Sequence, residues 1–167
     1  MPRVFHLGDG ISTDAIIPGR YNVGADRDAL GRACLIEARP DLAGAVHPGD
    51  VIVAGRNFGC GSSREHAQIA IQASGIAVVV ARSFARIFYR NAVNIGLPVI
   101  TCDALWEAVA EGDQVSVDTR TGRITAGDRV FEGDAPSAVA LRIIEAGSLV
   151  ALIREHGWSA IEEVVAS

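Results

Sequence analysis

The chain has 167 residues, of which 49% are hydrophobic and 21% charged, and its formal net charge is −5. That length is enough to bury a core, and we expect residues 1–167 to form a single domain. No apolar run approaches the ~20 residues of a membrane-spanning helix, and residues 1–5 lack the apolar stretch of a signal peptide. We therefore expect a cytoplasmic protein with no membrane segment, and an acidic chain without a basic run is a poor candidate for binding nucleic acid.

The metal-binding residue types are dispersed. Cys34, Cys60 and Cys102 are far apart in sequence and form no C-x-x-C pair, and the histidines form no H-E-x-x-H motif. Spacing therefore excludes a disulfide scaffold, and it excludes an iron–sulfur or zinc site built by this chain alone. Every basic residue is arginine, which excludes Schiff-base chemistry on lysine and a Walker-A phosphate loop.

The first 46 residues carry many turn and charged residues. Residues 8–21 (GDGISTDAIIPGRY) combine two carboxylates with turn residues and end on an arginine and a tyrosine. Asx turns account for most of this pattern without any function. For residues 21–46, which are broken by glycine and proline, we expect a partly mobile loop with one short helix around residues 30–37.

A β-α-β-α-β pattern follows. Apolar runs and turn residues predict a strand over residues 51–54, a helix with a capping box at Ser62 and Glu65 and a stop at Gly75, a strand over residues 76–81, a helix from Ser83 to Gly96, and a strand over residues 97–100. This order predicts parallel strands with right-handed crossovers.

The remaining third of the chain has a different pattern. Residues 113–133 alternate and turn, which predicts short antiparallel strands. The C-terminal third is helical in pattern, with Pro136 near a helix start and Gly147 near a helix end. The predicted fold is α/β, with a mostly parallel βαβαβ core and additional short antiparallel strands.

The segment with the clearest chemistry is residues 57–66 (NFGCGSSREH). It follows the strand over residues 51–54, and parallel α/β sheets bind ligands beyond the carboxyl ends of their strands. Gly59 and Gly61 permit close approach of a ligand, and free N–H groups at a helix start together with Arg64 predict a carboxylate site. The alternative is that Ser62 and Ser63 only cap the helix, which is the usual role of an S-x-x-E pattern; the glycines and Arg64 favour a site.

Three segments resemble the 3-isopropylmalate dehydratase small-subunit family of the aconitase superfamily: residues 9–21, residues 57–66 and residues 83–92. The resemblance covers essentially the whole chain. It implies a swivelling β/β/α domain and a reversible dehydration and rehydration of a hydroxy-dicarboxylic or tricarboxylic acid. It also implies a [4Fe-4S] cluster on a separate large subunit, in a heterodimer or heterotetramer, with no cofactor or metal bound by this chain.

The resemblance also implies roles for individual residues. Ser62 is implied as the base that removes the proton next to a carboxylate, with Ser63 and Arg64 binding a substrate carboxylate. Asp9 and Ser12 are implied at the rim of the site, and Arg20 as a second anchor. The implied specificity loop comprises Tyr21, Asn22, Val23 and Gly24, where the family usually has leucine in place of Asn22.

Several interpretations stay open. The substrate can be isopropylmalate in leucine biosynthesis, or that of a homoaconitase or of a (2R)-2-methylmalate or 2,3-dimethylmalate dehydratase. A non-catalytic anion-binding regulatory module is an alternative of another class. A Rossmann nucleotide site is disfavoured, because Gly55, Gly59 and Gly61 do not form G-x-G-x-x-G and no acidic residue ends the second strand. We expect the isolated chain to be inactive, and residues 21–46 to be partly disordered without the partner.

Overall fold

The computed structural model describes residues 1–166, without the side chains of Val164 and Val165. The strands in this part of the chain are β1 (Val4–His6), β2 (Val51–Ala54), β3 (Val78–Ala81), β4 (Val99–Thr101), β5 (Val115–Val117), β6 (Arg123–Ala126) and β7 (Arg129–Glu132). The α-helices are α1 (Thr13–Ile16), α2 (Arg27–Arg32), α3 (Glu65–Ser74), α4 (Arg86–Asn94), α5 (Asp103–Ala108), α6 (Ala138–Ala146), α7 (Leu149–His156) and α8 (Ser159–Val165). Short 3-10 turns occur at Gly19–Tyr21 and Pro40–Leu42.

A four-stranded parallel sheet forms the centre of the fold. Its strand order is β1-β2-β3-β4, and β5, β6 and β7 form a separate antiparallel sheet. The predicted α/β fold, the βαβαβ core and the short antiparallel strands are thus confirmed. Strand β1 was missed, because three residues are too short to show a pattern; its register, Val4 opposite Val51, comes from pairing with β2.

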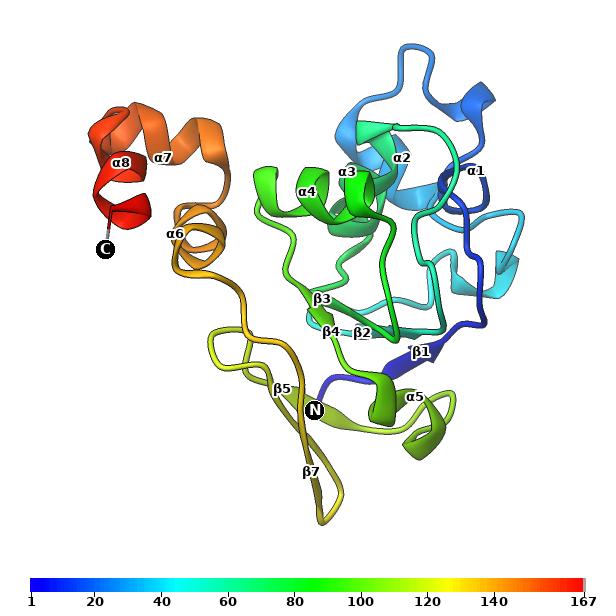
Figure 1. Ribbon diagram of the computed structural model, residues 1–167. Coiled ribbons are helices and arrows are strands. Elements are labelled where there is room, and N and C mark those ends of the chain that lie inside the picture. Colours follow the sequence, from blue (N-terminus) through cyan, green and yellow to red (C-terminus); the bar gives the residue numbers. More distant parts are fainter. Residues whose placement is uncertain (167) are drawn as a thin grey trace.

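The sheet is buried on both faces, as parallel sheets are. Helices α2, α3 and α4 lie over one face, and α5 and the antiparallel strands lie under the other (Figure 1). Alternate residues of β2 divide between two cores: Ile52 and Ala54 pack toward the three helices, whereas Val51 and Val53 pack toward α5 and the small sheet. The sequence run Val-Ile-Val-Ala therefore reflects burial on both sides.

Two predicted helix starts are wrong. The helix expected to begin at Ser62 begins at Glu65, and its N-cap Arg64 makes no side-chain capping bond. Gly61, at φ +92°, turns the chain away from a helical path and leaves Ser62 in the loop. The helix expected at Ser83 begins at Arg86, because the Ser83 hydroxyl instead accepts from the Asn57 N–H at 2.8 Å.

Other element boundaries are confirmed or shifted. Helix α3 ends at Gly75 with φ +104°, as predicted, and α6 is capped by Ser137 and closed by Gly147 at φ +92°. The short helix expected at residues 30–37 lies earlier, as α2, because the Asp26 carboxylate caps it by accepting from Ala29 N–H at 2.7 Å. The expected disorder of residues 21–46 without a partner stays a prediction.

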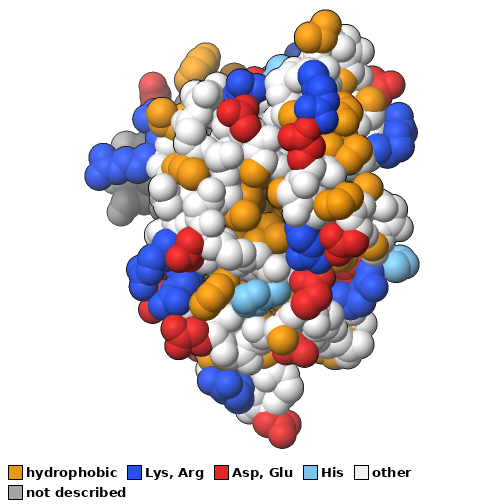
Figure 2. Space-filling view, turned by 90° about the vertical axis from the view of Figure 1, so that its right-hand side faces the viewer, with side chains coloured by type: hydrophobic (Ala, Val, Ile, Leu, Met, Phe, Trp, Pro, Cys, Tyr) orange, Lys and Arg blue, Asp and Glu red, His pale blue; other side chains and the backbone are white. Residues whose placement is uncertain are grey.

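The surface carries side chains of both charges. On the face drawn in Figure 2, basic and acidic side chains are interspersed around an apolar hollow. Within residues 1–166, no helix is both long and apolar enough to cross a membrane.

Candidate functional site

The candidate site is a cavity of about 210 Å³ between the loop after β2 and the start of α4. The loop contributes Ser62, Ser63 and Arg64, and the opposite wall comes from α4. Both segments follow parallel strands, β2 and β3, so the topology brings them to the same edge of the sheet. The predicted anion-binding loop therefore does line a cavity.

The serine loop, residues 57–64, is anchored to the core by aromatic packing. Phe58 is buried and packs edge-to-face against Phe88 of α4, with ring centroids 5.2 Å apart. Gly59 lies against Phe88 with φ +79°, and a Cβ atom at position 59 would be 2.1 Å from the Phe88 ring. Only glycine fits this position, which explains the first glycine of the loop motif.

Thr13 fixes the other side of the loop. Its side chain is only 1% exposed, and its hydroxyl donates to the Ser62 carbonyl at 2.9 Å. Its backbone N–H donates to the Cys60 carbonyl at 2.9 Å. One buried residue of α1 thus holds two successive parts of the loop, and it sets the position of the Ser62 peptide.

Ser62 and Ser63 lie exposed at the cavity. The Ser63 hydroxyl is 3.5 Å from the Asn91 amide nitrogen, which donates to it. Among residues 1–166, no group accepts from the backbone N–H groups of Ser62, Ser63 or Arg64. These donors lie just before the N-terminus of α3, where the helix dipole also favours an anion.

The Arg64 guanidinium has defined neighbours. Its Nη2 is 3.1 Å from Oδ1 of Asp14, and the Arg64 side chain is 31% exposed. Gly19 lies against the same group, since a Cβ atom there would be 2.7 Å from Nη1. The contact with Asp14 uses one carboxylate oxygen, so the guanidinium keeps further donors for a second carboxylate.

Three other predicted residues lie outside the cavity lining. The Asp9 carboxylate accepts from Arg56 N–H at 2.6 Å, and Ser12 caps α1 by accepting from Ala15 N–H at 3.1 Å. Arg20 lies over the Tyr21 ring, 4.8 Å from its centroid, and forms an ion pair with Glu37. Their implied roles toward a substrate stay predictions.

The expected specificity loop presents one apolar and one unpaired polar group. Val23 is 88% exposed. The side-chain oxygen of Asn22 is buried and has no hydrogen-bond partner among residues 1–166. Leaving a buried acceptor unpaired costs about 1–3 kcal/mol. The loop's role in specificity stays a prediction.

Sequence reasoning missed three residues of the cavity. Thr13, Arg86 and Asn91 all line it, and none of the three was among the predicted site residues. Arg82, which precedes α4, is not part of the lining and pairs with acidic side chains of α5. The signal that could have found Arg86 and Asn91 is topological: α4 follows β3 at the sheet edge that also carries the serine loop.

The donor atoms of this chain do not fit an iron–sulfur cluster. Cys34 and Cys102 are buried in two different core clusters, and the Cys60 thiol donates weakly to the Gly10 carbonyl at 3.6 Å. Burial raises the pKa of the Cys34 thiol to about 12, so it remains protonated. Within the part of the chain that is described, no three His, Cys, Asp or Glu residues come together as metal ligands.

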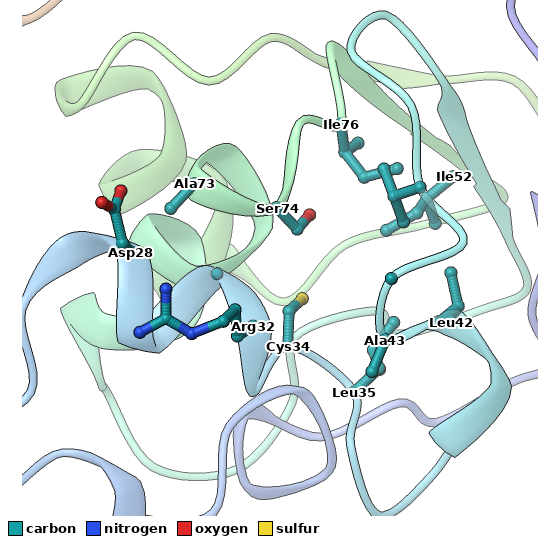
Figure 3. Close-up of a pocket in the computed structure, with 13 residues that line it drawn as sticks. Asp28, Arg32, Cys34, Leu35, Leu42, Ala43, Ile52, Ala73, Ser74 and Ile76 are labelled. Atoms are coloured by element: carbon teal, nitrogen blue, oxygen red, sulfur yellow. The ribbon is translucent and has the colours of Figure 1, made fainter.

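A second cavity, of about 280 Å³, lies away from the serine loop (Figure 3). Leu35, Leu42, Ile52 and Ile76 form much of its wall. Ile76 precedes β3 and Ile52 lies in the first half of β2, so this cavity is near the amino ends of the strands. Asp28, Arg32 and Ser74 also line it, so polar groups are present, but the loop residues Ser62, Ser63 and Arg64 do not reach it.

Comparison with known proteins agrees with the geometry. The model of the aconitase C-terminal domain family matches residues 40–104. The chain is 48% identical to the 3-isopropylmalate dehydratase small subunit 1 of Methanopyrus kandleri over 163 residues, covering 96% of this chain and 95% of that protein. It is 46% identical to the isopropylmalate/citramalate isomerase small subunit of Methanocaldococcus jannaschii, with 92% of each chain covered.

A solved structure gives the same result. The crystal structure of 3-isopropylmalate dehydratase from Methanocaldococcus jannaschii superimposes with a TM-score of 0.88 at 39% identity, covering 97% of each chain. The fold expected from the resemblance is thereby confirmed. Fold, loop motif and full-length similarity agree, and the chain belongs to the 3-isopropylmalate dehydratase small-subunit family.

Proposed function

We propose that this chain is the small subunit of a 3-isopropylmalate dehydratase, acting as one swivelling domain. The enzyme would interconvert 2-isopropylmalate and 3-isopropylmalate in leucine biosynthesis, in the cytoplasm. The observation that carries this proposal is the grouping of Ser62, Ser63 and Arg64 in one cavity beside unpaired backbone N–H groups. The names of the full-length relatives support the reaction class.

Different residues of this chain bind the substrate and transfer the proton. Arg64 and the N–H groups before α3 bind one substrate carboxylate, and Asp14 keeps the guanidinium oriented. Ser62 takes the proton from the carbon next to that carboxylate, while the C–O bond on the neighbouring carbon breaks and an alkene forms. Rehydration in the opposite sense returns the proton from Ser62 and places the hydroxyl on the other carbon.

A neutral serine hydroxyl is a weak base, so Ser62 can accept the proton only if its alkoxide form is stabilised. The nearby N–H groups and the Arg64 guanidinium supply that stabilisation, because opposite charge and hydrogen bonds to the anion lower the pKa of a hydroxyl. Ser63, which accepts from the Asn91 amide, is placed to donate its own proton to the bound carboxylate. This division makes Ser62 the base and Ser63 a binding residue.

Departure of hydroxide needs a Lewis acid, and the donor set of this chain does not fit one. We propose that a separate large subunit carries a [4Fe-4S] cluster that supplies this chemistry, in a heterodimer or heterotetramer. Under this proposal the isolated small subunit is inactive. The unpaired N–H groups and exposed serines then belong to a site that the partner completes.

One relative motivates a test with a second substrate. The Methanocaldococcus jannaschii protein is named for both isopropylmalate and citramalate, and citramalate carries a smaller side group on the same hydroxy-dicarboxylic acid. Asn22 stands where the family usually has leucine, and this change makes the expected specificity loop more polar. Homoaconitate and dimethylmalate are the remaining alternatives.

The testing experiment is anaerobic co-expression with a cluster-bearing large subunit of the same family. Formation of the alkene is followed by its ultraviolet absorbance with 2-isopropylmalate, citramalate and homocitrate. The proposal predicts turnover of 2-isopropylmalate by the complex and none by either chain alone. A stable complex that turns over citramalate but not 2-isopropylmalate would reassign the substrate, and a complex inactive on every acid would favour a non-catalytic role.

A further inference from the structure

The outward face of α4 carries an exposed isoleucine between two arginines. Ile87 is 54% exposed, whereas Phe88, Ala92 and Val93 of the same helix are buried in the core. Arg86 and Arg90 are both exposed. Within residues 1–166, neither arginine forms an ion pair, in contrast to Arg82 at the end of the preceding strand. We refer to Arg86, Ile87 and Arg90 as the α4 ridge.

The α4 ridge stands between two hollows. On one side is the candidate site, whose lining includes Arg86 and Ile87. On the other side is a hollow of about 490 Å³, whose lining includes Phe84, Tyr89 and both arginines of the ridge. A ridge with a hollow on each side offers a shape that a complementary surface can enclose.

We propose that the α4 ridge is the surface by which this chain docks on its large subunit, against a patch with an apolar pocket for Ile87 and acidic side chains for the two arginines. The inference rests on the proposed function. The partner must cover the cavity that holds Ser62, and Ile87 forms part of the lining of that cavity. An acidic patch follows from the charge of the two arginines, which have no counter-ion among the described residues of this chain.

Other exposed apolar residues provide matched controls. Val130 lies in β7 and is 47% exposed, close to the value for Ile87, but it does not line either hollow. An aspartate at position 130 therefore introduces the same charge on a similarly exposed site away from the proposed contact. Burying an unpaired carboxylate at an interface is costly, so only the variant at the true interface should weaken binding.

The experiment measures the dissociation constant of the full-length chain for the cluster-bearing large subunit by isothermal titration calorimetry under anaerobic conditions. Ile87→Asp is expected to weaken binding at least 100-fold, and Val130→Asp less than threefold, with unchanged melting temperatures of the free small subunits. Wild-type binding is expected to weaken with added salt, and Arg90→Glu to reduce that salt dependence.

The outcomes separate this inference from the proposed function. If Ile87→Asp binds as tightly as wild type and the wild-type complex turns over 2-isopropylmalate, the proposed docking surface is wrong and the proposed function stands. If Ile87→Asp loses binding selectively but the wild-type complex has no activity on any acid, the docking surface stands and the function is wrong. Equal weakening by Ile87→Asp and Val130→Asp would also overturn the docking surface.

Discussion

Replacing Gly59 by alanine tests whether the serine loop depends on the contact between its glycine and the core. Gly59 has φ +79°, where an L-residue costs about 1–2 kcal/mol. The added Cβ would lie 2.1 Å from Cγ of Phe88, which is 1% exposed and cannot move outward. Overpacking of this kind costs about 1–3 kcal/mol, so we expect Gly59→Ala to lower the free energy of unfolding by about 2–5 kcal/mol.

Gly127 provides the control for backbone strain alone. It has φ +57°, and apart from its own chain neighbours no heavy atom of the described residues lies within 4 Å of the position that an added Cβ atom would take, so Gly127→Ala should cost only about 1–2 kcal/mol. Urea denaturation of both variants, followed by circular dichroism, gives the comparison. Equal costs at positions 59 and 127 would refute the argument, because the contact with Phe88 would then contribute nothing.

Three further predictions concern the loop, an ion pair and a thiol. Thr13→Val removes the donor to the Ser62 carbonyl, and it should lower the free energy of unfolding by about 1–2 kcal/mol and kcat of the complex about tenfold. Thr13→Ser keeps the hydroxyl and should retain most of both. Equal kinetics in the two variants would count against positioning of the loop by the hydroxyl. Burial alone raises the pKa of Asp50, but hydrogen bonds from two backbone N–H groups and from the Arg3 guanidinium outweigh burial and lower the pKa overall. The ionised Asp50 therefore stabilises the fold fully above the unfolded-state pKa of about 4, and this stabilisation is lost as the pH falls through the folded-state pKa. Asp50→Asn should therefore cost about 2–3 kcal/mol at neutral pH, with a difference from wild type that shrinks in acid; a constant difference in denaturation curves down to about pH 3 would contradict this linkage. Because burial raises the pKa of Cys34 to about 12, iodoacetamide at about pH 8 should leave this thiol unlabelled until the chain unfolds. Rapid labelling of Cys34 in the folded chain, measured by mass spectrometry, would contradict this prediction.

The elements with long or regular patterns were predictable from the sequence. The buried strands β2, β3 and β4, the helices between them and the glycine stop at Gly75 follow from apolar runs and turn residues. The location of the serine loop beyond a strand end also followed from the topology of parallel sheets. These features depend on local residue choice, which the sequence displays directly.

The misplaced helix starts have a tertiary cause. Ser62 and Ser83 have the residue type of an N-cap, but Thr13 binds the carbonyl of the first and the Asn57 N–H binds the hydroxyl of the second. Both partners are 26 or more residues away along the chain. Local propensity cannot reveal such contacts, and strand β1 was missed for the same reason, since its pairing with β2 defines it.

The parts of the site that come from distant segments were likewise hidden. Arg86 and Asn91 line the cavity because α4 follows β3 at the same sheet edge, and the contact between Arg64 and Asp14 joins the serine loop to α1. The structure therefore adds the second wall of the cavity to the loop that the sequence identified.

The most direct test of the account is the effect of Ser62→Ala on turnover by the assembled complex. Assembly and melting temperature should match wild type, because the Ser62 side chain is exposed and the contact to Thr13 uses its backbone carbonyl. Loss of a general base is expected to lower kcat by about 10²–10⁴-fold, with a smaller change in KM, whereas Ser63→Ala should mainly raise KM. If Ser62→Ala in an intact complex retained kcat within about threefold of wild type, far less than loss of a base predicts, Ser62 would not be the base and the central claim would be wrong.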